Sequence, residues 1–400
     1  MITIDEHRGR ILAAARPLPV VQVPLGEALG LVLAGDVAAR WPVPLFDNSA
    51  MDGYAVRRAE AVEGARLRVI ADVPAGSPLD PPLGAGETAR IMTGAAIPGD
   101  ADAVLPLEDT DLGRTIGAAP PEWITVTRRP APAAFVRRRG ADASAGAVAV
   151  PAGVALGPWQ LAAIAAAGHD RVAVRRRPRV AVVSTGSELV LPSAAPRRGQ
   201  VPESNSVLLA AALRDAGADV AGVATVPDDE EALLRVIEAT EADAVVLSGG
   251  ASVGAFDVVR NVLGRTGAAS FDEVAMQPGR PQGFGTTVDG TLIFCLPGNP
   301  VSVAVSFEML VRPALRRLAG HSDLDRPRVT RIAAESWVCP PHRTQVIPVV
   351  LDDRFVRPAS PGGSGSHLVA SLAAAQALAI VPAEVEQVHE GDAVAVMVLA

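Results

Sequence analysis

The region between about residues 175 and 320 most constrains the fold, because strand-like and helix-like runs alternate along it. A continuous apolar, β-branched run over residues 179–184 indicates a buried strand. Further strands are predicted over residues 219–226, 242–248 and 291–296, and helices over residues 204–216, 228–239, 256–263 and 300–318. Alternation of this kind predicts βαβ units and a parallel sheet covered by helices on both faces.

The segments on either side of this region differ from it, because short β-like runs there are separated by proline and glycine. A chain of 400 residues exceeds the ~250–300 at which one hydrophobic core stops growing. We therefore predict a multidomain α/β plus β protein with a central α/β domain. Its predicted parts are an N-terminal linker domain (1–48 and 141–174), an inserted β-rich domain (49–140), the α/β domain (175–322) and a C-terminal β domain (323–400).

Charge and cysteine content exclude several classes of function. The formal net charge of -8 gives no basic face for nucleic acid. Apolar stretches are interrupted before the ~20 residues that a membrane helix needs, and residues 1–16 form an amphipathic helix candidate rather than a signal peptide. Two cysteines without the spacing of a zinc or redox motif favour a reduced, cytoplasmic setting.

Polar residues and glycines follow the predicted strands, where ligands bind in parallel sheets. The segments 184–188 (STGSE) and 248–254 (SGGASVG) are expected to present backbone N–H groups and hydroxyls to a phosphate. The residues concerned are Ser184, Gly186, Ser248, Gly249, Gly250 and Ser252. Glu188 and Asp257 add carboxylates that suit Mg²⁺ beside a phosphate. The alternative is that both segments are tight turns, with Asp257 in the first turn of a helix.

Two further loops belong to the same predicted edge. Residues 296–302 (LPGNPVS) place Pro297 and Gly298 before Asn299 as N-cap, with Pro300 at the first helical position and Ser302 in the first turn. Residues 277–281 (QPGRP) carry Arg280, whose guanidinium can bind an oxoanion through two N–H groups. A solvated surface loop is the alternative for the second segment.

The β-rich domain contains two acidic segments, residues 46–56 and 137–142. From spacing alone, an Asx turn and a solvated strand edge explain them as well as a site does. The six histidines are scattered without a ligand pair, so no zinc site is assigned.

Eight segments in a fixed order nevertheless resemble the molybdopterin molybdenumtransferase family, the bacterial MoeA type related to the gephyrin E domain. They are FDNSAMDGYAV (46–56), RIMTGAAIPGDADAV (90–104), RRRGADASAG (137–146), STGSEL (184–189), SGGASVGAFD (248–257), PGRPQGFG (278–285), LPGNPVS (296–302) and GGSGSHLVASLAAAQAL (362–378). The resemblance covers almost the whole chain.

The resemblance implies an elongated, four-domain homodimer with its site between the α/β domain of one subunit and the β domain of the other. It implies Mg²⁺-dependent insertion of molybdate into adenylated molybdopterin with release of AMP, and the molybdopterin adenylyltransferase as a partner. The family's acidic positions fall on Asp52, Asp142, Glu188 and Asp257, and its threonine on Thr93. Arg280, Pro297, Pro300 and Ser302 match loops near the nucleotide and oxoanion, and Arg343, Ser364 and Ser366 match more loosely.

One departure concerns charge. Family members often carry KPGKP where this chain, which has no lysine, reads Gln277-Pro-Gly-Arg280-Pro. Arg280 keeps a charge and Gln277 loses one, which is expected to weaken oxoanion binding. Two other functions remain as alternatives: a nucleotide enzyme similar to molybdopterin adenylyltransferase, and a non-catalytic binding scaffold.

Overall fold

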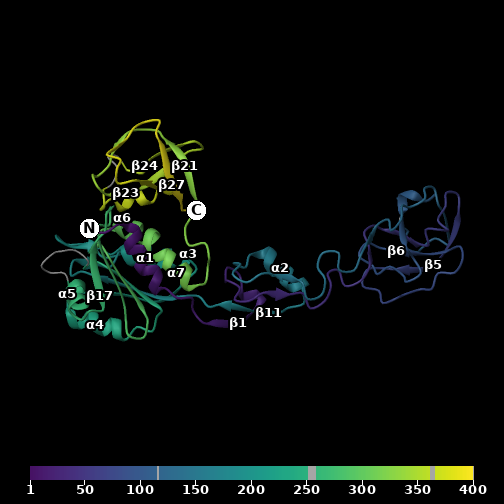
Figure 1. Cartoon of the computed structure of the whole chain (residues 1–400), viewed down its shortest axis with the longest axis horizontal. Coiled ribbons are helices and arrows are strands. Elements are labelled where there is room, and N and C mark those ends of the chain that lie inside the picture. The colour runs from purple at the N-terminus through teal and green to yellow at the C-terminus, as the bar shows by residue number, and fades with distance from the viewer. Residues whose placement is uncertain (115–116, 251–257, 361–364, 400) are drawn as a thin grey trace.

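The protein is elongated, with two domains at one end, one at the other and a linker unit between them (Figure 1). The computed structural model describes residues 1–114, 117–250, 258–360 and 365–399. Within these ranges, no helix is both long enough and apolar enough to span a bilayer. The α/β layer lies beside the C-terminal β domain, and the inserted β-rich domain lies at the opposite end (Figure 1).

The α/β layer is built on a six-stranded sheet in the order β15-β12-β16-β20-β19-β17. The predicted parallel part is present, since β12 (Arg179–Thr185) pairs in parallel with β15 (Asp219–Val226) and β16 (Ala244–Ser248), and β16 pairs with β20 (Leu292–Leu296). Two antiparallel strands that were not predicted extend it, β19 (Pro281–Thr286) and β17 (Ala269–Glu273). The sequence did not predict β19 because this strand contains a proline and two glycines, which are uncommon within strands. A Cβ on Gly285 would lie 1.8 Å from the Ala268 carbonyl oxygen, so this close pairing requires glycine.

Helices cover both faces of this sheet. One face packs on α3 (Asn205–Asp215) and on the run α6 (Pro300–Ser306), η3 (Phe307–Val311) and α7 (Arg312–Leu318). The other face packs on α4 (Glu230–Glu238) and α5 (Val258–Arg265). Alternate residues of β12 divide between the two cores, Val182 to the first and Val183 to the second. The helix predicted over residues 300–318 is present as the continuous run α6, η3 and α7, in which η3 is a π-helical turn.

The N-terminal helix α1 (Ile4–Ala14) begins with a capping box between Thr3 and Glu6. Its Ile11 is fully buried in the core of the α/β layer, together with Ala15. The predicted grouping of residues 1–48 with the linker domain is wrong for this helix. Its weak amphipathic pattern indicates a buried face but not the domain on which that face packs.

The linker unit joins two segments that are distant in sequence. Strand β1 (Val20–Pro24) pairs with β11 (Arg171–Arg175), and β2 (Val37–Ala38) pairs with β10 (Val148–Val150). Helix α2 (Pro158–Ala166) and the 3₁₀ turn η1 (Leu25–Glu27) complete it. The two flanks of the inserted domain thus pair with each other.

The inserted β-rich domain contains a five-stranded sheet in the order β7-β4-β6-β5-β8. The bounds are β4 (Gly53–Val56), β5 (Arg66–Val73), β6 (Glu87–Ile91), β7 (Ala103–Pro106) and β8 (Trp123–Thr125), with η2 (Leu107–Asp109) after β7. Strand β3 (Asn48–Ser49) pairs with β9 (Val136–Arg137) at its base. Both faces of the sheet are apolar and carry separate small cores.

The C-terminal domain is a closed β structure in which the order β23-β24-β21-β27-β25 returns to β23. Its strands are β21 (Arg328–Ala333), β23 (Thr344–Leu351), β24 (Phe355–Pro358), β25 (Ala377–Val381) and β27 (Ala393–Val398), with β22 (Trp337–Val338) paired to β26 (Gln387–Val388). Helix α8 (Val369–Leu372) precedes β25. Strand β18 (Met276–Gln277), from the α/β region, pairs in parallel with β23 and so joins the two domains.

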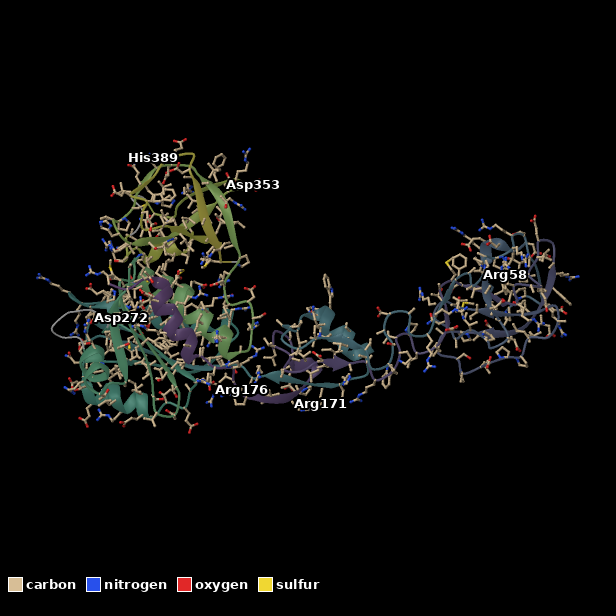
Figure 2. The ribbon with its side chains drawn as sticks, viewed as in Figure 1. Arg58, Arg171, Arg176, Asp272, Asp353 and His389 are labelled. Atoms are coloured by element: carbon tan, nitrogen blue, oxygen red, sulfur yellow. The ribbon has the colours of Figure 1, made fainter. Side chains whose placement is uncertain are left out.

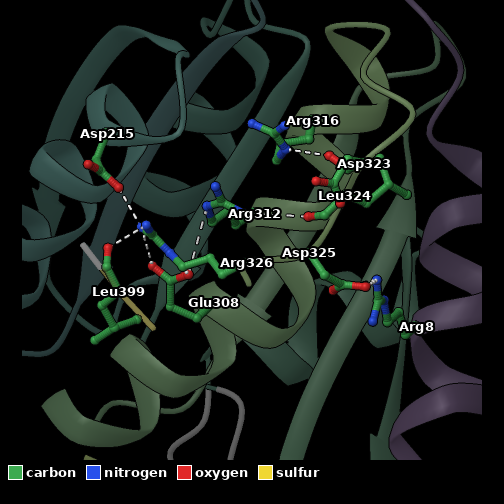
Figure 3. A network of polar contacts seen from close by, with 10 residues as sticks. All are labelled: Arg8, Asp215, Glu308, Arg312, Arg316, Asp323, Leu324, Asp325, Arg326 and Leu399. Atoms are coloured by element: carbon green, nitrogen blue, oxygen red, sulfur yellow. Dashed lines mark hydrogen bonds and ion pairs between the residues drawn. The ribbon is translucent and has the colours of Figure 1, made fainter. Parts of the chain in front are cut away.

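A network of ion pairs also fastens the C-terminal domain to the α/β layer (Figure 3). Arg326, just before β21, donates from Nε to Glu308 Oε2 of η3 at 2.8 Å and pairs with Asp215 at the end of α3. It also donates to the carbonyl of Leu399, beyond the last strand. One arginine therefore holds four chain segments together.

Candidate functional site

A pocket of about 870 Å³ lies at the carboxyl ends of β12, β16 and β20. The loops after these strands form its walls, with the short strands β13 (Leu189–Val190) and β14 (Val201–Pro202) at one side. Most of the predicted binding residues of the α/β region line it, together with one serine from the C-terminal domain. They are Gly186, Glu188, Ser248, Gly249, Gly250, Arg280, Pro297, Gly298, Asn299, Pro300, Ser302 and Ser366.

The glycines allow the three loops to approach closely. Gly249 has φ +91°, and a Cβ there would lie 2.5 Å from the Thr185 carbonyl oxygen and 2.8 Å from Thr185 Oγ1. Its N–H donates to the Leu296 carbonyl, and the N–H of Gly186 donates to the Val226 carbonyl, both at 3.2 Å. The expectation that these two N–H groups face an anion is therefore wrong: the sheet edge uses them to join neighbouring strand ends.

A buried carboxylate at the pocket connects the strand ends to α3. Glu203, 6% exposed, accepts from Ser184 Oγ at 3.0 Å and from the Ser206 N–H at 2.9 Å. Ser184 Oγ also lies 3.1 Å from Ser248 Oγ. Ser184, predicted as a substrate donor, is thus occupied by protein partners and does not line the pocket.

Sequence reasoning missed Glu203 and its neighbour Asn205, both of which line the pocket. The sequence predicted Ser204 or Ser206 as the cap of α3. Ser204 occupies the cap position without a side-chain capping bond, and the Glu203 carboxylate accepts from the first turn instead. Asn205 Nδ2 donates to the Gly298 carbonyl at 2.8 Å. The available signal for these two residues was the cluster of polar residues before an apolar helix. Helix capping already accounted for that cluster, so the sequence offered no separate reason to predict a binding role.

The C-terminal domain reaches the pocket through Ser366. Asn299 stands at the N-cap position of α6, but its side chain makes no capping bond; its Nδ2 donates to Ser366 Oγ at 3.1 Å. The Val301 N–H donates to the Ser366 carbonyl, also at 3.1 Å. The predicted cap role of the Asn299 side chain is therefore wrong, and the start of α6 is held by the neighbouring domain. Ser364 lies outside the described residues.

Both predicted basic residues have protein partners. Arg280 Nη2 lies 2.6 Å from Glu273 Oε1, with both side chains about half exposed. Arg343 Nη1 donates to Gln277 Oε1 at 2.9 Å, and Gln277 lines the pocket. The glutamine that stands where a lysine was expected therefore orients an arginine at the domain boundary, and the charge of Arg280 is shared with a carboxylate.

Two acidic side chains reach the pocket near its mouth. Glu188 is exposed, and Asp228, which sequence reasoning missed, accepts from the Ser187 N–H at 3.0 Å while its own N–H donates to Ser187 Oγ at 3.1 Å. Among the described residues, no group of three or more His, Cys, Asp or Glu is placed to hold a metal ion. Magnesium commonly takes one or two carboxylates plus substrate phosphates and water, a mode that this sparse arrangement fits. Asp257 and Ser252 lie outside the described ranges.

The remaining predicted residues lie in or next to the inserted β-rich domain. Asp52 Oδ1 accepts from the Thr93 N–H at 2.7 Å and from Thr93 Oγ1 at 2.8 Å. These residues meet because β4 and β6 are antiparallel neighbours, with Gly53 opposite Ile91. Gly53 is required here, since a Cβ would lie 2.1 Å from the Leu105 carbonyl oxygen.

Asp142 is exposed in the loop after β9, where its N–H donates to the Val43 carbonyl at 2.9 Å. Nearby, the backbone N–H of Arg139 and the guanidinium of Arg138 lower the pKa of Asp47 below its ordinary value. The Asp47 carboxylate is therefore ionised and fixes the strand pair β3–β9 at the base of the domain.

Within one chain, Asp52, Thr93 and Asp142 do not meet the pocket. Figure 2 labels Arg58 in the inserted domain and Asp272 in the α/β layer at opposite ends of the molecule. The linker unit lies between them (Figure 1). The predicted site residues thus form two separate groups, one lining the pocket and one on the distant domain.

Family comparisons cover nearly the whole chain. Residues 2–168 match the MoeA N-terminal region (domains I and II), residues 181–317 match a probable molybdopterin binding domain, and residues 330–399 match the MoeA C-terminal region (domain IV).

Individual proteins give the same result. The chain is 40% identical to "Molybdopterin molybdenumtransferase 2" of Mycobacterium tuberculosis over 98% of both chains. It is 31% identical to the molybdopterin molybdenumtransferase of Haemophilus influenzae over 99% of this chain and 98% of the other. A solved MoeA protein from Pyrococcus horikoshii superposes with a TM-score of 0.82 at 27% identity, covering 100% of both chains.

Proposed function

This chain belongs to the MoeA family of molybdopterin molybdenumtransferases, and on that basis we propose that it inserts molybdate into adenylated molybdopterin and releases AMP. The observation that carries the proposal is the pocket at the carboxyl ends of three parallel strands, where α/β domains bind their ligands. At about 870 Å³ its volume is in the range of sites for ligands of this size.

The proposed reaction cleaves a phosphoanhydride, which develops negative charge on phosphate oxygens. Glu188, at the pocket mouth, is the described residue suited to hold Mg²⁺ together with those oxygens, and Asp257 is the second predicted ligand. When bound, the cation would neutralise the developing phosphate charge. The chain's own residues bind and orient: the first turn of α6 with Ser302 lies at the pocket, as does the guanidinium of Arg280.

The separation of the two residue groups supports a homodimer. Asp52, Thr93 and Asp142 match the family's motifs, yet none of them lines the pocket of its own chain. In the proposed dimer, the inserted domain of one subunit completes the pocket of the other. The proposed setting is the cytoplasm, with the molybdopterin adenylyltransferase supplying the adenylated substrate.

AMP release measured from adenylated molybdopterin with Mg²⁺, with and without molybdate, tests this function. We expect AMP to appear only when molybdate is present, together with activation of an apo-molybdoenzyme. Removal of Mg²⁺ with a chelator should abolish the release. As a matched control, the exposed Asp353, at the tip of a hairpin in the C-terminal domain, is replaced by Asn and should leave turnover unchanged.

Two other outcomes would contradict the proposal. Consumption of ATP with free molybdopterin would indicate an enzyme similar to the adenylyltransferases. Binding of the adenylated substrate without molybdate-dependent AMP release would indicate a scaffold.

A further inference from the structure

Two polar atoms of residues that line the pocket are buried without a hydrogen-bond partner among the described residues. They are Asn205 Oδ1 and Thr185 Oγ1, and their residues are 9% and 5% exposed. Both residues line the pocket. A buried polar atom left unpaired loses its hydrogen bond to water without replacement, so native proteins rarely retain one without a reason. Two such atoms in residues that line the same pocket indicate a place where a ligand supplies the missing partner.

The orientation of Asn205 is fixed by its other contact. Its Nδ2 donates to the Gly298 carbonyl at 2.8 Å, and because a carbonyl can only accept, the amide cannot be turned round without placing two acceptors together. Oδ1 is therefore the atom without a partner, and it can only accept.

Glu203 holds this arrangement in place. Its carboxylate fixes the first turn of α3 through the Ser206 N–H at 2.9 Å and ties it to β12 through Ser184 Oγ at 3.0 Å. Asn205 lies between Glu203 and Ser206 in the chain. Thr185, the last residue of β12, is left uncovered by Gly249, because a Cβ at position 249 would lie 2.8 Å from Thr185 Oγ1.

The chemistry of these atoms limits what they can bind. An acceptor such as Asn205 Oδ1 needs an N–H or O–H donor, whereas ionised phosphate and molybdate oxygens only accept. We propose that Asn205 and Thr185 form a subsite for a hydroxyl or amino group of the nucleotide part of the substrate. The phosphate and molybdate oxygens then lie elsewhere in the pocket. This inference rests on the proposed function and assigns a binding role to one part of its pocket.

Thr185→Val tests the subsite, because it removes a hydroxyl that has no hydrogen-bond partner among the described residues. AMP is the probe, and its dissociation constant is measured by calorimetry. We expect the constant to rise about 5- to 10-fold, corresponding to one lost hydrogen bond, while the thermal unfolding midpoint stays the same or rises. Thr225→Val, an exposed residue that pairs with Ser184 on the adjacent strand β15, is the matched control and should leave AMP binding unchanged.

Asn205→Ala and AMP analogues identify the donor group. Wild-type protein is titrated with 2′-deoxy-AMP, 3′-deoxy-AMP and purine riboside monophosphate, which lacks the amino group. The analogue that lacks the contacted donor should bind the wild type more weakly, and Asn205→Ala should weaken it no further. Inorganic pyrophosphate should bind the wild type and both variants equally.

Three results would overturn the subsite: unchanged AMP affinity in both variants, full affinity of all three analogues for the wild type, or weakened pyrophosphate binding in the variants. In each case the proposed function is judged separately, by molybdate-dependent AMP release from the wild type. If the wild type itself fails to bind AMP, the proposed function fails and the subsite fails with it.

Discussion

Asp52 illustrates how a single side chain is fixed at the residue scale. One of its oxygens accepts both the N–H and the hydroxyl of Thr93, at 2.7 and 2.8 Å, so the carboxylate is oriented while its second oxygen has no hydrogen bond to another described residue. Gly53, next along the chain, allows β4 to pack directly against the Leu105 carbonyl. A carboxylate held in this way keeps one orientation, which the proposed dimer would use at the pocket of the other subunit.

Asp52→Asn separates charge from position. The amide oxygen still accepts from Thr93, so the fold and the loop should remain intact. We expect the turnover of molybdate-dependent AMP release to fall about 10²–10³-fold, the typical loss when one preorganised group is removed from a transition state. Steady-state kinetics measures the turnover, and circular dichroism melting checks the fold. Wild-type turnover in this variant would remove Asp52 from the mechanism.

At the element scale, the end of α7 combines backbone capping with a half-buried histidine. The Gly320 N–H donates to the Arg317 carbonyl and the His321 N–H to the Arg316 carbonyl, with Gly320 at φ +84°, which is a Schellman ending. The His321 imidazole accepts at Nδ1 from Arg316 Nη2 at 3.3 Å. Burial, with the charges of Arg316 and Arg312, lowers the pKa of His321 to about 4.

This lowered pKa makes stability depend on pH. The unfolded chain takes up a proton at His321 near its ordinary pKa of 6.5, but the folded protein does so only near 4. Unfolding therefore binds a proton between these values, and the free energy of unfolding falls as the pH is lowered through that window. In urea denaturation, His321→Asn should lose less stability than the wild type between pH 7 and pH 5. Equal losses in the two proteins would contradict the assigned cause.

At the scale of the whole molecule, direct contacts join the α/β layer to the C-terminal domain at one end. The inserted domain lies apart from them at the other end (Figure 1). Arg326 joins α3, η3 and the C-terminal domain (Figure 3), and β18 adds a strand to β23 across the same boundary. These connections hold Ser366 against the start of α6. The inserted domain, in contrast, lies beyond the linker unit and away from the pocket of its own chain (Figure 1).

Mixed dimers test whether the divided residues meet between subunits. Asp52→Ala and Glu188→Ala chains, with different affinity tags, are co-expressed and the heterodimer is purified. One of its two sites would combine an intact pocket with an intact inserted domain, so we expect about half of the wild-type rate per dimer, while each homodimer stays inactive. A heterodimer as inactive as both homodimers would show that the two residues act within one chain, and a purified monomer would exclude the shared site.

The sequence by itself determined the elements whose signal is local. The strand predicted at residues 219–226 coincides with β15, and the one predicted at residues 242–248 contains β16, because apolar and β-branched runs are local in the sequence. It also indicated the loops that line the pocket, since ligands bind beyond the carboxyl ends of parallel strands.

Tertiary structure alone decided what depends on distant residues. β19 contains proline and two glycines and becomes a strand only because β17 and β20 flank it. Arg280 and Arg343 looked like free cations in the sequence, but Glu273 and Gln277 pair with them. In the sequence, Glu203 is an ordinary polar residue just before a helix. Only the fold places it beside Ser184. Such contacts form only when separate strands and loops come together in the fold, and local patterns carry no information about which partner a side chain will meet.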